Sequence, residues 1–266
     1  MDLNDLPSHA IFRKRTHDMK IHTNDRAKGF TLIEMLVVIV LIAALAVIAF
    51  QATTRVRESA KSAATLNQLR DIGVAVGGWM SDNGGFFPPC WNGDKNQSYA
   101  QVLDPYMHGV ENLRKADSRF IGINKRIVVE VRNGSHPITF SLNDALCPNV
   151  TLDKGDPAKT RTLIHSSRVS RLSDVILMAD GCQNPKNLGQ ANASAFRVKG
   201  AAGASGPNSQ RSGLIPVGPD ADEPSAGGWF RYPYGKCHAL LCDGSARTFP
   251  KGSIKKGNVW MDSDIP

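Results

Sequence analysis

Residues 29–50 are the feature that most constrains the fold, because this run of 22 residues contains one charged side chain, Glu34. About 20 apolar residues in an α-helix cross the hydrocarbon core of a bilayer, so the run predicts a membrane-spanning helix. An ionised carboxylate in such a helix costs about 2.5–3.5 kcal/mol on insertion scales and normally marks a partner or a function. A cut after Gly29 would make Phe30 the N-terminus, whose free amine can meet Glu34 of a neighbouring subunit.

A recognisable motif opens the run: Lys28-Gly29-Phe30-Thr31-Leu32-Ile33-Glu34. This motif, followed by an apolar segment, resembles the cleavage and methylation motif of type IV prepilins and type II secretion pseudopilins. The resemblance implies that a prepilin peptidase/methyltransferase cuts after Gly29 and methylates Phe30. It also implies self-assembly through the N-terminal helix, with Glu34 as an assembly residue, and partnership with other pseudopilins and an inner-membrane secretion platform.

Two other interpretations of the apolar run stay open. A secretory signal would find a small-x-small triplet at Ala44-Leu45-Ala46, although this triplet lies in the middle of the run. The other interpretation is an uncleaved membrane anchor, and the charged Glu34 within the apolar run argues against it. Six Lys or Arg residues precede Gly29 and predict a cytoplasmic N-terminus. We therefore expect a single-pass protein of the bacterial inner membrane, with its C-terminal head in the periplasm or outside the cell, and a filament after assembly.

The chain is predicted to have four parts and an α+β fold resembling that of pilins. Residues 1–29 are a basic leader, 30–50 the transmembrane half of a long helix, 51–85 its extracytoplasmic half and 86–266 a β-rich globular head. Residues 51–80 contain no proline, and apolar residues recur every three or four positions from Ala52 through Leu69 and Val76 to Trp79, which predicts one helix over 31–80 with one apolar face. Residues 183–228, rich in Gly, Ala, Ser, Asn and Pro, predict a flexible insertion.

The head is predicted to form a mixed sheet of short strands. β-Branched and aromatic runs indicate strands at 127–131, 137–142, 175–179, 229–232, 238–242, 246–249 and 259–261. Asp243-Gly244 favours a hairpin with a tight two-residue turn, and 104–117 favours a short helix. Residues 171–180 and the Asp243-Gly244 hairpin resemble a planctomycete-type pseudopilin-like family with a His-x9-Asp-Gly signature, but Pro233 stands at the position of the signature His.

Charge and cysteines narrow the choice of partners. The net charge of +8 is scattered without a Lys/Arg stripe or interleaved aromatic residues, so no nucleic-acid partner is expected. The five cysteines permit up to two disulfides in an exported head, and their pairing stays open. They are Cys90, Cys147, Cys182, Cys237 and Cys242. The sequence has no Cys-x-x-Cys pair of the kind that would indicate a zinc site.

The sequence predicts no enzyme and no cofactor. It contains no Gly-x-Ser-x-Gly elbow, phosphate-binding glycine loop or His-Glu-x-x-His motif. On a strand, Cys237 and His238 point to opposite faces, and His238 and Asp243 are interpreted as hairpin residues. Acidic clusters are weaker candidates for calcium, since carboxylates are its preferred ligands. They comprise Asp220, Asp222, Glu223, Asp262 and Asp264.

The resulting hypothesis is a structural subunit of a pseudopilus or type IV pilus-like filament that serves type II-like protein secretion. One alternative keeps the filament but assigns it to adhesion, motility or DNA uptake. The other is a membrane-anchored extracytoplasmic binding or hydrolytic domain that carries a prepilin leader.

Overall fold

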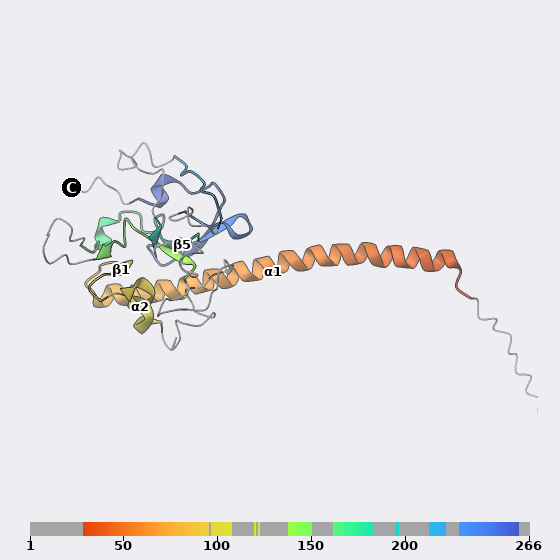
Figure 1. The fold of residues 1–266 in the computed structure, drawn as a ribbon, viewed down its shortest axis with the longest axis horizontal. Helices are drawn as coiled ribbons and strands as arrows, with labels where there is room; N and C mark the ends of the chain where they lie inside the picture. The colour runs from red at the N-terminus through yellow and green to blue at the C-terminus, as the bar shows by residue number, and fades with distance from the viewer. Residues whose placement is uncertain are drawn as a thin grey trace, which may run out of the picture. The chain divides into compact units, whose positions relative to one another are not determined.

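The computed structural model of the 266-residue chain describes residues 29–95, 97–107, 120, 122, 138–150, 162–182, 195–196, 213–221 and 229–260. The chain divides into two units, residues 1–51 and 52–266. Helix α1, Leu32–Asp82, begins in the first unit and ends in the second (Figure 1). A long apolar helix followed by a head with mixed sheets confirms the predicted α+β class.

The N-terminal part of α1 is apolar on every side. Large apolar side chains from Leu32 to Phe50 are exposed on all sides of the helix. A helix that is apolar all round is suited to burial in lipid or among other helices. Within the described ranges, α1 is the one helix long and apolar enough to cross a membrane. Its 51 residues span roughly 75 Å at 1.5 Å per residue.

The C-terminal part of α1 is amphipathic and packs in the head. Its buried residues recur every three or four positions: Thr65, Leu69, Ile72, Ala75 and Val76. The predicted apolar face is thus confirmed from residue 65 onward. It was predicted to begin at Ala52, and this was wrong, because Val56 is 66% exposed.

Two glycines end α1. The amide of Gly85 donates a hydrogen bond to the Met80 carbonyl at 2.7 Å, which is the pairing of a Schellman cap. Gly84 and Gly85 have φ angles of +63° and +85°, a region that costs other residues energy. The helix predicted to stop near Met80 therefore ends at Asp82.

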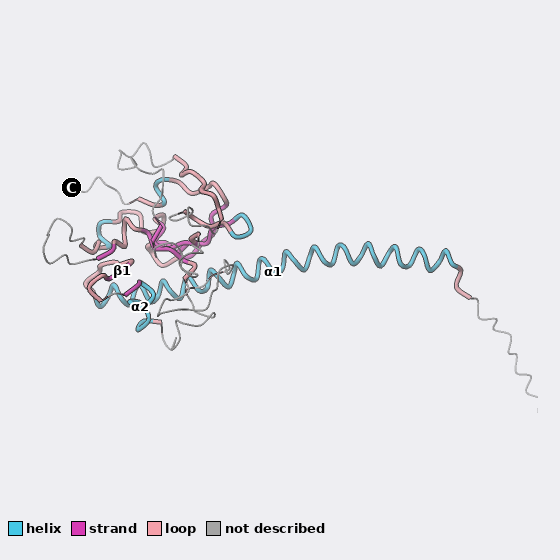
Figure 2. Tube along the Cα trace, in the orientation of Figure 1, coloured by secondary structure: helices cyan, strands magenta, loops and turns pink. Residues whose placement is uncertain are grey.

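The main sheet of the head has five strands in the order β6-β3-β5-β7-β8 (Figure 2). Strand β3 runs Phe140–Asn143, β5 Ile176–Asp180, β6 Ala195–Phe196, β7 Lys236–Leu241 and β8 Ala246–Pro250. The β3–β6 pair is parallel and the other pairs are antiparallel, so the predicted mixed sheet is confirmed.

Strand β7 separates two apolar clusters. Leu240 belongs to the cluster that contains Leu69 and Ile72 of α1. Cys237, Ala239 and Leu241 belong to a second cluster. Because side chains alternate along a strand, His238 shares the face of Leu240, which is the face towards α1.

The β7–β8 hairpin forms where it was predicted, but its turn differs. The amide of Gly244 donates to the Leu241 carbonyl, and the amide of Leu241 donates to the Ser245 carbonyl, which leaves three residues in the loop. Gly244 has a φ of +82°, whereas Asp243 does not have a positive φ. The turn is therefore a three-residue turn with a glycine bulge, not a two-residue turn.

A second, three-stranded sheet has the order β2-β1-β4. Its strands are β1 Trp91–Asn92, β2 Gln97–Ser98 and β4 Asn149–Val150. Helix α2, Tyr99–Leu103, and the 3₁₀ turn η1, Asp104–Tyr106, lie partly ahead of the helix predicted over 104–117, whose later residues fall outside the described ranges. Further 3₁₀ turns are η3 Ser166–Arg168, η8 Pro233–Gly235 and η9 Lys256–Asn258.

Three strand predictions have other outcomes. The strand at 127–131 lies outside the described residues. At 229–232 the structure has only an isolated bridge from Phe230 to Gly181. The strand at 259–261 was wrong where it can be compared, because Val259 and Trp260 follow η9 without pairing. Of the predicted insertion, only residues 195–196 and 213–221 are described.

Candidate functional sites

The first site is the start of α1, where Glu34 closes a helix cap. The Glu34 Oε2 atom accepts hydrogen bonds from the backbone amide and the hydroxyl of Thr31, each at 2.8 Å. In return, the Thr31 hydroxyl accepts a bond from the Glu34 amide at 3.3 Å. This reciprocal arrangement is a capping box, which supplies partners for amides that the first helical turn leaves unpaired. Glu34 therefore has a local partner within a single chain, besides the intersubunit partner expected from the sequence.

Gly29 and Phe30 precede this cap and are not helical. Both residues are exposed, and the Phe30 side chain is 74% exposed. The first carbonyl to accept a helical bond is that of Thr31, from the Met35 amide. The bond between the two predicted processing residues is thus outside the helix and open to solvent.

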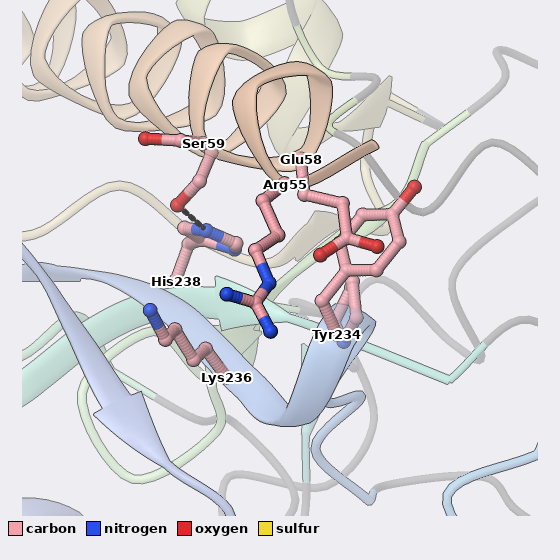
Figure 3. A pocket seen from close by; sticks show the side chains of 8 residues that line it. Arg55, Glu58, Ser59, Tyr234, Lys236 and His238 are labelled. Atoms are coloured by element: carbon pink, nitrogen blue, oxygen red, sulfur yellow. Dashed lines mark hydrogen bonds between the residues drawn. The ribbon is translucent and has the colours of Figure 1, made fainter. Parts of the chain in front are cut away.

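The second site is a cavity of about 270 Å³ in the head. One wall is α1 and the other is η8 with the start of β7. Its lining consists of Arg55, Glu58, Ser59, Ser62, Pro233, Tyr234, Lys236 and His238. Figure 3 shows Arg55 and Glu58 extending from the helix towards the side where Tyr234, Lys236 and His238 lie. Tyr234 has a φ of +53°, a conformation that non-glycine residues rarely adopt.

Two of the residues that line this cavity, Ser62 and His238, belong to a Ser–His–Asp triad. The Ser62 hydroxyl lies 2.6 Å from Nε2 of His238, the contact drawn as a dashed line to His238 in Figure 3, where Ser62 carries no label. Nδ1 of His238 lies 2.6 Å from Oδ2 of Asp180. Ser62 comes from α1, His238 from β7 and Asp180 from the end of β5. Ser62 is half-buried, whereas the side chains of His238 and Asp180 are 1% and 0% exposed.

The hydrogen bonds define the tautomer of His238. Oδ2 of Asp180 also accepts the backbone amide of His238 at 2.9 Å, so this oxygen acts as an acceptor. Nδ1 is then the protonated ring nitrogen and Nε2 accepts the hydroxyl proton of Ser62. The backbone bond and the ring bond together fix the imidazole against the carboxylate.

Asp180 has a buried carboxyl group whose pKa is subject to opposing effects. Burial raises its pKa above the ordinary value, although the hydrogen bonds and charge of His238 and the charge of Arg231 act in the opposite direction. Its Oδ1 atom is buried without a hydrogen-bond partner in the described part of the chain. Within that part of the chain, the Asp180 carboxylate therefore accepts hydrogen bonds from His238 through Oδ2 alone.

Asp220, a candidate calcium ligand, forms ion pairs with two basic side chains of the head. Its Oδ1 lies 2.6 Å from the Arg231 guanidinium and its Oδ2 3.0 Å from the Lys251 ammonium. Burial acts to raise the Asp220 pKa, but the Tyr232 amide, Arg231 and Lys251 hold it below the ordinary value. The remaining candidates, Asp222, Glu223, Asp262 and Asp264, fall outside the described residues.

All five cysteines are thiols in this structure, and four of them are buried. Cys90 and Cys147 belong to the core cluster that includes residues of α1, and Cys242 packs against it. Cys237 belongs to the second cluster. No group of three or more His, Cys, Asp or Glu residues suited to a metal occurs in the part of the chain that is described.

Comparison with known proteins bears on the first site. Residues 24–50 match the family described as the prokaryotic N-terminal methylation motif. No curated protein and no solved structure matches the chain. The predicted resemblance is confirmed: the chain has a prepilin-type N-terminus followed by a long apolar helix, as type IV pilin-like and pseudopilin-like proteins do. This combination indicates a membrane-anchored protein that a prepilin peptidase processes and that takes part in a pilin-like assembly.

Proposed function

We propose that this protein is a structural subunit of a pseudopilus that serves type II-like protein secretion. The observation that carries the proposal is the position of the methylation motif, which covers Gly29, Phe30 and Glu34 and runs directly into the exposed apolar half of α1. An apolar surface of this extent needs lipid before assembly and neighbouring helices after it. Filament packing supplies the second environment.

Processing creates the contact that sets the register between subunits. Cleavage after Gly29 leaves a methylated amine on Phe30, and this cation pairs with Glu34 of the next subunit. Within a bundle of apolar helices, an unpaired carboxylate is strongly unfavourable, so the pair selects one axial position. Before assembly, the Thr31 cap gives Glu34 its partners.

The basic leader orients the chain with its N-terminus in the cytoplasm, because Lys and Arg residues in short flanking segments remain there. The head then lies in the periplasm or outside the cell. Other pseudopilins and the inner-membrane secretion platform are its partners. Filament assembly requires surfaces of the head rather than catalysis by it, and no cofactor.

Mass spectrometry of the mature N-terminus tests the proposal. In cells with an active prepilin peptidase, the protein should begin at a methylated Phe30, and replacing Gly29 with a bulky residue should leave the precursor in the membrane. A protein that begins at Met1, or after Ala46, would contradict the proposed processing. A Gly77→Ala control leaves the motif intact and should be processed normally.

The two alternative functions predict different gene neighbourhoods. Genes for a secretion ATPase and a secretin beside this one would favour secretion, whereas retraction motors and competence genes would favour a pilus for adhesion, motility or DNA uptake. An isolated gene would favour an anchored binding or hydrolytic domain. The Ser–His–Asp triad beside the cavity is the observation that keeps this last candidate in view.

A further inference from the structure

We propose that Ser62 is the nucleophile of an acyl-transfer site in the head, with His238 as its general base and Asp180 as the residue that positions the imidazole. This activity needs only the folded head and goes beyond the role of the protein in a filament. Its substrate class is a small ester that carries a negative charge.

The hydrogen bonds give each residue the role that such chemistry requires. A serine hydroxyl becomes nucleophilic when a base removes its proton as it attacks, and here Nε2 of His238 lies 2.6 Å from that hydroxyl. A buried carboxylate keeps the base in the correct tautomer and stabilises the imidazolium that forms, and Oδ2 of Asp180 lies 2.6 Å from Nδ1. The same constellation recurs on unrelated folds and is recognised by its geometry.

A purely structural clamp accounts less well for these contacts. A clamp needs no access, yet Ser62 is half-exposed and both Ser62 and His238 line the cavity. Among the described residues, the hydrogen bonds to the Asp180 side chain both come from His238, so the carboxylate is committed to the imidazole. The serine is accessible on the side where a substrate can enter.

The charges of the cavity indicate the substrate. Arg55 and Lys236 line it and are exposed, and neither is ion-paired within the described ranges. Among the described residues that line the cavity, Glu58 is the one acidic side chain, so these residues carry an excess of positive charge. Because the Ser62 amide lies inside a helix and donates within it, side-chain cations must stabilise an oxyanion here. The same cations attract a substrate that carries a carboxylate.

The reaction is a two-step hydrolysis. The Ser62 oxygen attacks the ester carbonyl carbon while its proton moves to Nε2 of His238. The carbon–oxygen bond to the alcohol then breaks, the alcohol takes the proton from Nε2, and an acyl group stays on Ser62. Water attacks this acyl group, gives a proton to Nε2, and releases the acid, after which the proton returns to Ser62.

A fluorophosphonate probe tests the nucleophile in the full-length protein, purified in detergent. Attack by the Ser62 oxygen forms an oxygen–phosphorus bond and expels fluoride, and peptide mass spectrometry locates the adduct. We expect labelling of Ser62 in the wild type, none at this position in Ser62→Ala, and at least an approximately 100-fold slower reaction in His238→Gln, the scale of general-base catalysis. Ser81→Ala, on the exposed end of the same helix, is the matched control and should be labelled as the wild type is.

Several results would overturn the proposal. These are an unlabelled wild-type protein whose cooperative thermal unfolding shows that it is folded, labelling at Ser59 instead of Ser62, or equal labelling in His238→Gln. The wild-type experiment stands even if a variant fails to fold, because the adduct is located without any substitution.

A second measurement tests the substrate class. Hydrolysis of mono(4-nitrophenyl) succinate, which is anionic, is compared with that of neutral 4-nitrophenyl acetate. We expect the anionic ester to be preferred, and the double variant Arg55→Gln/Lys236→Gln to lose roughly tenfold of that preference, the order expected for a screened charge contact. A preference that is absent in the wild type, or unchanged in the double variant, would refute the assignment of the cations.

Discussion

Two substitutions at Glu34 separate its roles in the helix cap and in the filament. Glutamine at this position retains a side-chain oxygen that can accept the two bonds from Thr31, but it removes the charge. Valine removes both. Insertion into the membrane should be intact or improved in each variant, because a neutral residue enters lipid more easily. Any loss of assembly then reports on the contact between subunits.

The free energies of the helix cap and of the ion pair between subunits can be compared. A helix cap contributes about 1 kcal/mol, so its loss lowers the population of an intact first turn roughly fivefold. Removing one partner of a desolvated ion pair costs about 3–5 kcal/mol, which corresponds to more than about 100-fold in association. Glu34→Gln should therefore lose nearly as much assembly as Glu34→Val. Thr31→Ala, which weakens the cap and keeps the carboxylate, should lose far less.

In-cell crosslinking between spine helices and recovery of sheared fibres, at matched expression, measure the effect. Cleavage serves as the internal control, because the peptidase reads Gly29 and should process all three variants. If Glu34→Gln assembles as well as the wild type, the carboxylate is only a capping group here. The proposed pair with the Phe30 amine would then be refuted, and the anchored-domain alternative would gain support.

Four further predictions concern the head. Asp220→Ala should lower the free energy of unfolding by roughly 3 kcal/mol in chemical denaturation, because it removes the carboxylate that pairs with the buried Arg231. The pKa of Asp220 is lower in the folded state than in the unfolded state. Its contribution to the free energy of unfolding should therefore be fully present above the ordinary carboxyl pKa of about 3.9 and be lost as the pH falls through the folded-state pKa. Acid unfolding of Asp220→Asn beside the wild type checks this. Gly244→Ala should cost about 1 kcal/mol in thermal unfolding, since φ is +82° there, and an unchanged melting temperature would contradict the turn. Burial raises the pKa of the Cys147 and Cys237 thiols, so iodoacetamide should modify them slowly until the protein unfolds, and rapid modification under native conditions would contradict their burial.

The sequence was most informative where structure is local. The apolar run and the absence of proline predicted α1 to within two residues at its C-terminus, because helix formation depends on neighbouring residues. The capping box was also readable, since Thr31 and Glu34 have the Thr-x-x-Glu spacing. The same Glu34 is also suited to a partner in another subunit, so the spacing alone does not decide between the two roles.

The triad was beyond sequence analysis because its contacts are long-range. Ser62 and His238 are 176 positions apart, and Asp180 and His238 are 58 apart. Strand alternation correctly placed His238 opposite Cys237. A further signal lay in the helix, because Ser62 precedes Thr65 and Leu69 at helical spacing and so continues the buried face. Which strand would meet that face depended on the strand order, which the sequence did not show.

The cap at Thr31 has a consequence for proteolysis. A protease reads its substrate as extended chain, so a scissile bond inside a helix must first be unwound, at the cost of several hydrogen bonds. By making Leu32 the first helical residue, the capping box leaves the Gly29–Phe30 bond accessible to the enzyme without unwinding. Glu34, the proposed assembly residue, would thus also keep the proposed cleavage site of the precursor outside the helix.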